Sequence, residues 1–218
     1  MRQEDFAADY YITATAALSD TQFAELEQLL TVSFKDEPFL CCVVPEDSEH
    51  REFVASWMFS RRLQLFLPNS YCLVRKLDGK VVGHAALSPP SAEGMAPSLW
   101  TKIKLGFLWA PFALGYTCFS RLLEGFSHFK KTEDEKDLWS LEAVAVDPSE
   151  RGKGLGSEFM RALMNKVVPT GQDIYMATQK KGLAEFYSRL GFAVIRQGEL
   201  PLAETTFPNW FMKTGTIQ

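Results

Sequence analysis

The sequence predicts a three-layer α/β fold, in which helices cover both faces of a mixed sheet of about seven strands. Short apolar or β-branched segments alternate with amphipathic segments of helical period along the chain. Asp78-Gly79 is a strong two-residue hairpin signal, so at least one pair of neighbouring strands is antiparallel. We expect residues 1–218 to form a single domain, because a chain of 218 residues can fill one core.

The first part of the chain is expected to supply elements in the order β-α-α-β-β. The expected strands are residues 11–17, 71–76 and 80–87. The first helix begins after Ser19, which forms a capping-box pattern with Gln22, and it ends ahead of Asp36-Glu37-Pro38. The second helix is expected to begin at Asp47 or Ser48, both of which are good N-cap residues.

Residues 91–131 are expected to form an apolar, helical insert. Residues 105–119 carry no charge, but this stretch is shorter than the roughly 18 to 20 residues needed to cross a bilayer, and Pro111 interrupts it. We therefore interpret it as a buried helix or a pocket wall rather than as a membrane contact.

The second part of the chain continues as β-α-β-α-β-β after the insert. Two helices are expected here, one that opens after residue 156 and is closed by Pro169-Thr170-Gly171, and a short one along residues 183–190 that Gly191 ends as a C-cap residue. The expected strands are residues 138–146, 173–178, 192–196 and 209–213, of which the last two are expected to pair.

Composition and charge exclude several classes of protein. The net charge is −4 and no basic stripe is present, which argues against a nucleic-acid partner. The first residues contain no apolar segment of the kind found in a secretion signal. The four cysteines have neither metal-ligand spacing nor a disulfide pattern. We expect a cytoplasmic protein with no bound metal and no membrane partner.

A glycine-rich turn at residues 151–156 is the strongest functional signal. It follows an apolar strand that ends in Val-Asp-Pro and opens an amphipathic helix. Its three glycines leave the backbone N–H groups free to converge on one point, which is also the positive end of the helix dipole. The turn therefore predicts a site for a pyrophosphate.

Two common phosphate-binding motifs do not fit this turn. A Walker A loop requires Gly-Lys-Ser or Gly-Lys-Thr after a first glycine and four residues, and Gly152-Lys153-Gly154 lacks that spacing. A dinucleotide fingerprint requires Gly-x-Gly-x-x-Gly near the start of the fold, but Gly156 follows Gly154 after one residue.

The spacing that fits is Arg-x-x-Gly-x-Gly, present as Arg151, Gly154 and Gly156. This pattern resembles motif A of the GNAT superfamily of acyl-CoA-dependent N-acetyltransferases. Downstream, Phe186-Tyr-Ser-Arg-Leu-Gly-Phe192 resembles the Phe-Tyr-x-x-Leu-Gly-Phe block of the same family. The segments that look like its puromycin N-acetyltransferase-like branch are Phe34-x-Asp36-x-Pro38-Phe39, Trp139-Ser-Leu141, Gly156-Ser157 and Trp210-x-Met212.

The resemblance implies acetyl-CoA as cosubstrate and a mostly antiparallel sheet that splays between its fourth and fifth strands. It also implies that the main chain near Val144 and Val146 pairs with the pantetheine amides. Arg151 has a second interpretation, a surface salt bridge. The implied cofactor-binding residues are Val144, Ala145, Val146, Arg151, Gly152, Lys153, Gly154, Leu155, Gly156, Ser157 and Thr178.

Catalytic residues are also suggested by the resemblance. Tyr187 occupies the position of the family's general acid, which returns a proton to the departing coenzyme A thiolate, and the alternative is a core aromatic residue. Glu142 lies in an otherwise apolar strand, where burial would raise its pKa and suit it to act as the base. The alternative for Glu142 is a solvent-facing or salt-bridged residue.

Three further residues are candidates for the acceptor side of the site. His84 lies in a strand that could border the acceptor cleft, although a lone histidine in a strand is more often a hydrogen-bonded core residue. Asp36 or Glu37 could attract a cationic amine. A chain of water molecules without a dedicated base is a further alternative.

Two positions depart from the family pattern. Many relatives have an asparagine where Leu183 stands and a glutamate where Ala177 stands, which puts the usual base in doubt. The expected activity is direct transfer from acetyl-CoA to a small-molecule primary amine, by a monomer or homodimer. The alternatives are a noncatalytic acyl-CoA-binding sensor and a protein N-acetyltransferase. Four aromatic residues of the insert would suit a bulky amine, or would simply form a core or dimer contact: Phe107, Trp109, Phe112 and Tyr116.

Overall fold

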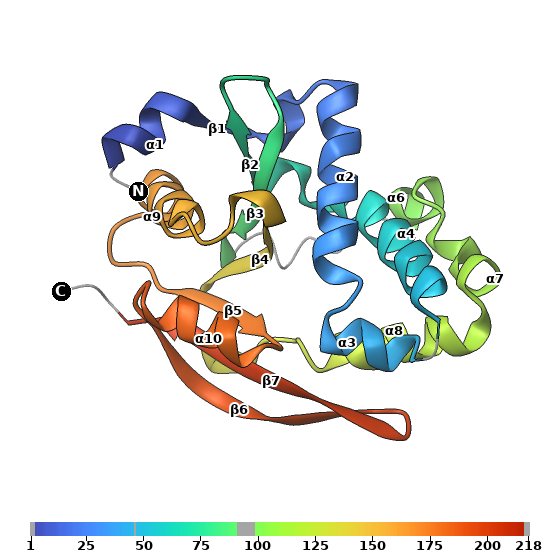
Figure 1. Cartoon of the computed structure of the whole chain (residues 1–218). Helices are drawn as coiled ribbons and strands as arrows, with labels where there is room; N and C mark the ends of the chain where they lie inside the picture. Colours follow the sequence, from blue (N-terminus) through green and yellow to red (C-terminus); the bar gives the residue numbers. More distant parts are fainter. Residues whose placement is uncertain (1–2, 46, 91–98, 216–218) are drawn as a thin grey trace.

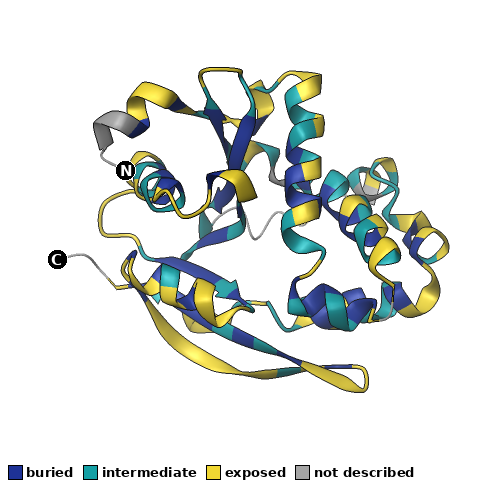
Figure 2. Cartoon of the chain, viewed as in Figure 1, coloured by how far each residue is buried: buried dark blue, intermediate teal, exposed yellow. Residues whose placement is uncertain are grey.

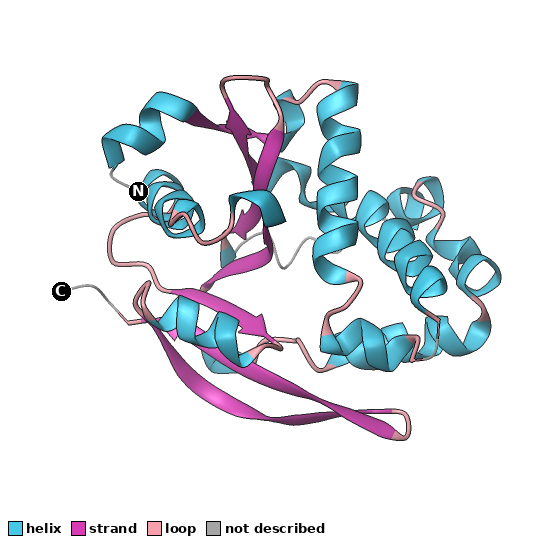
Figure 3. Cartoon of the chain, viewed as in Figure 1, coloured by secondary structure: helices cyan, strands magenta, loops and turns pink. Residues whose placement is uncertain are grey.

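The computed structural model describes residues 3–45, 47–90 and 99–215, and it contains a sheet of seven strands in the order β1-β2-β3-β4-β5-β7-β6 (Figures 1 and 3). Strands β4 and β5 pair in parallel, and the other neighbouring pairs are antiparallel. The predicted mixed, mostly antiparallel sheet is therefore confirmed. The strands are β1 (Tyr10–Ala14), β2 (Ser70–Arg75), β3 (Val81–Ser88), β4 (Trp139–Val146), β5 (Ile174–Thr178), β6 (Phe192–Leu202) and β7 (Thr205–Thr214).

Helices cover both faces of the sheet. α1 and α9 lie against one face of β1 to β4, and α2 and α4 lie against the other (Figure 1). Each face has its own cluster of buried apolar side chains, so the sheet separates two cores. The helices are α1 (Gln3–Asp9), α2 (Asp20–Phe34), α3 (Pro38–Val43), α4 (Ser48–Phe66), α6 (Leu99–Lys104), α7 (Ala110–Leu114), α8 (Tyr116–Ser127), α9 (Leu155–Val167) and α10 (Lys181–Ser188).

Local signals placed the helix starts well. Ser19 and Gln22 form both hydrogen bonds of the capping box at α2, and the side chain of Asp47 caps α4. Pro38 was expected only to end the preceding helix. It is also the first residue of α3, a position where its fixed φ angle and missing N–H are tolerated.

The last hairpin is longer than the sequence suggested. β6 and β7 pair from Phe192↔Thr214 to Leu202↔Thr205, whereas we expected two short strands. Most of β6 is exposed, and Gly198 and Pro201 interrupt its apolar pattern. A strand without a buried face gives no alternating signal, which is why its second half was missed.

The predicted splay between the fourth and fifth strands is also present. β4 pairs with β5 only at Trp139↔Ile174 and Ser140↔Tyr175, and the two strands then separate. On its other edge β4 has a bulge opposite β3, where Ala143 adopts a φ angle of 50°. A separation of this kind leaves main-chain groups of β4 without a strand partner on the β5 side.

His84 stabilises this bulge from β3. Its ring is fully buried, and Nδ1 lies 2.8 Å from the carbonyl oxygen of Ala143. Burial lowers the pKa of His84 to about 4, although the hydrogen bond opposes the shift, so the ring is neutral near pH 7. Nδ1–H therefore donates to the Ala143 carbonyl.

The apolar insert is buried only in part: among its described residues, Ala110, Leu114 and Cys118 belong to one of the two cores. Trp109, Phe112 and Tyr116 are 68%, 81% and 78% exposed, and Figure 2 shows the exposed residues of α7 in yellow. The interpretation of these three residues as core or pocket wall is therefore wrong. Phe107 does pack edge-on against Trp57 of α4. Within the described ranges, no helix is long and apolar enough to cross a membrane. The single domain expected for residues 1–218 stays a prediction.

Gly125 of α8 is needed for close packing against α3. A Cβ atom at this position would lie 2.2 Å from the ring of Phe39, which also packs against Phe126, Phe129 and Phe207. We expect Gly125→Ala to lower the free energy of unfolding by about 1–3 kcal/mol through overpacking, as measured by urea denaturation.

Gly182→Ala is the matched control, because Gly182 is also helical and its Cβ would meet no atom within 4 Å. This variant should be neutral or slightly stabilising. Equal unfolding free energies for the two variants would contradict the packing argument.

Candidate active site

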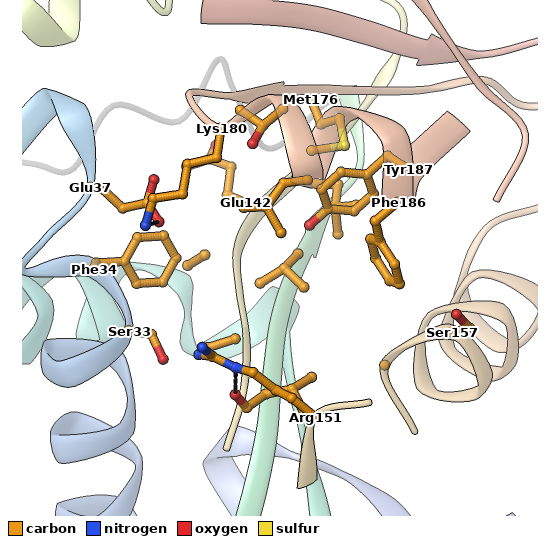
Figure 4. A pocket seen from close by; sticks show the side chains of 18 of the residues that line it. Ser33, Phe34, Glu37, Glu142, Arg151, Ser157, Met176, Lys180, Phe186 and Tyr187 are labelled. Carbon is orange, nitrogen blue, oxygen red and sulfur yellow. Dashed lines mark hydrogen bonds and ion pairs between the residues drawn. The ribbon is translucent and has the colours of Figure 1, made fainter. Parts of the chain in front are cut away.

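Two cavities meet where β4 and β5 separate. The first has a volume of about 550 Å³ and the second about 780 Å³. Figure 4 shows side chains of the first cavity, including Glu142 and Met176. The two cavities share part of their walls at the opening in the sheet. The residues common to both walls are Phe34, Leu141, Glu142, Ala143, Met176, Ala177 and Gln179.

The glycine-rich turn forms one end of the first cavity. Gly152 and Gly154 have φ angles of 77° and 81°, which L-residues with side chains rarely adopt. Gly154 is also the N-cap residue of α9, and its carbonyl accepts the N–H groups of Ser157 and Glu158. Among the described residues, no backbone acceptor takes the N–H groups of 152–156. The turn therefore has the geometry of an anion site.

Glu150 anchors this turn to the sheet. Its side chain is 5% exposed, and it binds Arg75 at 2.6 Å, Lys153 at 2.9 Å and the Tyr10 hydroxyl at 3.2 Å. The hydrogen bond from Lys153 and the other donors hold the pKa of Glu150 below its ordinary value. Glu150 was not among the residues predicted from the sequence, where its signal is a carboxylate directly before a basic, glycine-rich turn. The side chain of Lys153 serves this anchor and does not line the cavity.

Arg151 spans the gap between the turn and β4. Its Nε donates to the carbonyl oxygen of Val146 at 3.1 Å, the bond drawn in Figure 4. Arg151 thus pairs with the main chain of β4, rather than forming the surface salt bridge that was its second interpretation. Val144 and Val146 both line the first cavity.

Tyr187 lies on α10 and directs its hydroxyl into the first cavity (Figure 4). Its ring is 4% exposed and packs edge-on against Phe186 and Phe192, at centroid distances of 5.1 and 5.7 Å. Burial, and then the charge of Glu37, raise the pKa of Tyr187 well above its ordinary value. The hydroxyl is therefore a neutral proton donor at physiological pH.

Glu142 stands at the wall between the cavities, but it is not buried. Its side chain is 40% exposed and pairs with Arg62 of α4 at 2.8 Å. The expectation that the Glu142 carboxylate is buried is therefore wrong. The structure agrees with the alternative interpretation, in which Glu142 is a salt-bridged residue. Arg62 also lies over the ring of Phe126 at 4.9 Å, so the ion pair joins β4 to α4 and α8.

Glu37 and Lys180 form an ion pair at the edge of the first cavity. The distance between Oε1 and Nζ is 2.9 Å, and the two residues come from the α2–α3 loop and the N-cap of α10 (Figure 4). Glu37 is thus brought to the site, already neutralised by a cation. Asp36 and His84 line neither cavity, and their role as substrate-binding candidates stays a prediction.

Most of the predicted site residues are brought together by the fold. Thirteen line the first cavity: Glu37, Glu142, Val144, Ala145, Val146, Arg151, Gly152, Gly154, Leu155, Gly156, Ser157, Thr178 and Tyr187. The lining residues that sequence reasoning missed include Ser33, Phe34, Met176, Gln179, Lys180 and Arg189. Only their position in space identifies them, because they occupy ordinary helix, strand or loop positions. The described residues contain no cluster of metal-ligand side chains.

Solved structures share this architecture. A Corynebacterium glutamicum ATCC 13032 protein described as histone acetyltransferase HPA2 and related acetyltransferase matches with a TM-score of 0.61, 16% identity, and 96% and 98% of the two chains covered. An acyl-CoA N-acyltransferase from Pseudomonas aeruginosa matches with a TM-score of 0.50, 17% identity, and 95% and 99% covered. The protein smu.2055 from Streptococcus mutans UA159 matches with a TM-score of 0.55 and 14% identity, and the match covers 94% of this chain and 99% of that one. At these identities the matches support the fold.

The family is established by the sequence. The model of the acetyltransferase (GNAT) family matches residues 23–192, from α2 to the first residue of β6. This range contains the glycine-rich turn, the splayed strands and Tyr187. The chain therefore belongs to the GNAT family of N-acetyltransferases, which take their acetyl group from acetyl-CoA.

Proposed function

We propose that this protein transfers the acetyl group of acetyl-CoA directly to the primary amine of a small molecule, with both substrates bound at once. The observation that carries this proposal is the pair of cavities that share a wall at the opening between β4 and β5. A donor in one cavity and an acceptor in the other would meet at Glu142 and Ala143. Holding both reactants at one point removes most of the entropic cost of the encounter.

The first cavity is the proposed donor site. The pyrophosphate would bind the N–H groups of residues 152–156, at the positive end of α9. The pantetheine would lie along the unpaired edge of β4, near Val144 and Val146, with Ser157 and Thr178 in the same wall. Arg151 would have to exchange or share its bond to the Val146 carbonyl when the cofactor enters.

The reaction follows from this placement. The neutral amine nitrogen attacks the thioester carbonyl carbon, the C–S bond then breaks, and the nitrogen loses one proton. Tyr187 gives its proton to the thiolate, and it is reprotonated afterwards by the proton that the nitrogen lost, once that proton has passed through Glu142 or water. The products are an N-acetyl amide and the coenzyme A thiol. A leaving thiolate in the same buried surroundings also becomes a stronger base, which assists transfer from a phenol of raised pKa.

Glu142 is the proposed acceptor of the amine proton, directly or through water. The ion pair with Arg62 fixes its carboxylate at the shared wall, where an acceptor amine would arrive. A cytoplasmic location and a monomer or homodimer remain part of the proposal, as does membership of the puromycin N-acetyltransferase-like branch. The cytoplasmic location is supported by the four cysteines, all of which are free thiols.

Donor binding can be tested at the turn. We expect Gly154→Val to weaken coenzyme A binding by about tenfold or more, because a β-branched residue resists a φ angle of 81° and displaces the N–H groups. Gly171→Val is the matched control, since Gly171 has a φ angle of 83° in a turn outside both cavities. Isothermal titration calorimetry gives the dissociation constants. Equal loss of affinity in the two variants would contradict the assignment of the turn.

The general acid can be tested at α10. We expect Tyr187→Phe to lower kcat by about 10²-fold, with little change in the KM for acetyl-CoA, because the proton donor is lost and the ring stays packed. Tyr71→Phe serves as the control, because Tyr71 lines neither cavity. Thiol release measured with a chromogenic disulfide reports turnover. Wild-type kcat in Tyr187→Phe would exclude this role.

The base can be tested by the pH dependence of turnover. We expect Glu142→Gln to lower kcat/KM and to remove the acidic limb of its pH profile, since a carboxylate that accepts the proton must be ionised. Glu158→Gln is matched, because Glu158 also pairs with an arginine, Arg161, but lines neither cavity. An unchanged profile in Glu142→Gln would favour a water chain instead.

A further inference from the structure

The second cavity has a composition that narrows the class of acceptor. Its walls come from α2, α3, α4 and α8 on one side and from β4, β5 and the segment before β4 on the other. Apolar rings make up much of the lining and would enclose a flat or bulky body. The aromatic residues are Phe34, Phe39, Phe59, Phe126, Phe129 and Tyr175.

The charged residues of this cavity are almost all cationic. They are Arg62, Lys130, Lys131 and Lys136, against the single carboxylate of Glu142. Glu142 is already paired with Arg62. The cavity as a whole therefore presents an excess of positive charge, although the chain as a whole has a net charge of −4.

The acidic residues close to these lysines do not line the cavity. Glu135 is buried and binds Arg196 at 2.9 Å, and Glu133 pairs with Lys136 at 2.6 Å while most of its side chain is exposed.

Lys130 lines the second cavity with a positive charge that no acidic side chain neutralises among the described residues. Among the residues described, no hydrogen bond or ion pair engages its Nζ, yet it belongs to the cavity wall. It follows the last turn of α8, and its ammonium group is a positive charge in the cavity wall, so an anionic group of a ligand would be favoured beside it.

We propose that the acceptor is an amine that also carries an anionic group, a carboxylate or a phosphate, on an aromatic or similarly flat apolar body. The body would pack among the phenylalanine rings, and the anion would bind Lys130 and Lys136. The amine would then reach Glu142 at the opening between the strands. Polyamines fit this cavity poorly, since their cationic chain would meet the lysines. This inference rests on the proposed function, because it assigns the second cavity to the acceptor.

The test compares matched amines in the thiol-release assay with saturating acetyl-CoA. Phenylalanine is paired with phenylalanine amide, tryptophan with tryptamine, and the aminophosphonate analogue of phenylalanine separates phosphate-like from carboxylate recognition. Putrescine is the polyamine probe. We expect the anionic member of each pair to have a kcat/KM about tenfold higher, through a lower KM, as one or two charge-assisted hydrogen bonds would give.

Lys130→Gln should remove most of this preference by raising the KM of the anionic amines alone. The KM of acetyl-CoA should stay unchanged, and Lys130→Glu should invert the order within each pair. Lys166→Gln is the control, because Lys166 lies in the last turn of α9 outside both cavities. Thermal melting verifies that each variant is folded.

The outcomes separate the two claims. Turnover of the neutral or cationic amines that equals or exceeds that of the anionic ones overturns the inference and leaves the proposed acetyl transfer standing. An equal loss for both members of a pair in Lys130→Gln also overturns it. Binding of acetyl-CoA without thiol release for any amine overturns the proposed function, and the inference with it.

Discussion

The site depends on one feature of the sheet, which is the early end of the parallel pairing between β4 and β5. The strands share two residue pairs and then diverge, because β5 follows β7 while β4 stays paired with β3 through its bulge. His84 stabilises the bulge by donating to the Ala143 carbonyl. The divergence opens the sheet at the wall that the two cavities share and leaves the main chain of β4 without a strand partner at that edge. Both cavities exist because this pairing stops.

Carboxylates with little exposure to water fix the loops around the two cavities. Glu150 ties the glycine-rich turn to β2, Glu37 joins the α2–α3 loop to α10, and Glu135 joins the segment before β4 to β6. Each is mostly removed from water and has a cationic partner, as a desolvated carboxylate requires. Such pairs contribute little net stability, but they place loops from distant parts of the chain at defined positions, which binding of two substrates needs.

The fold and the glycine-rich turn were predictable to a large extent, and the contacts around the second cavity were not. The capping box at Ser19 and the glycine-rich turn are patterns of residues close together in the sequence, so they can be recognised without knowledge of the tertiary structure. The second half of β6 carried no alternating pattern and was missed. The predicted burial of the aromatic residues in the insert was wrong for a different reason. Apolar composition predicts burial, but Phe112 is 81% exposed. Composition alone does not reveal which neighbour covers a helix.

The sequence by itself determined the family, the acetyl donor and the order of the strands, because these depend on local backbone preferences and on short motifs. Tertiary structure decided which charges meet. Arg62 and Glu142 are 80 residues apart in the chain and 2.8 Å apart in space, which turned an expected buried base into an ion-paired carboxylate at a shared wall. The tertiary structure also placed Lys130, Lys131 and Lys136 in the same cavity as the phenylalanine rings of the helices. Contacts of this range depend on how β4 and β5 separate, and no local pattern encodes that separation.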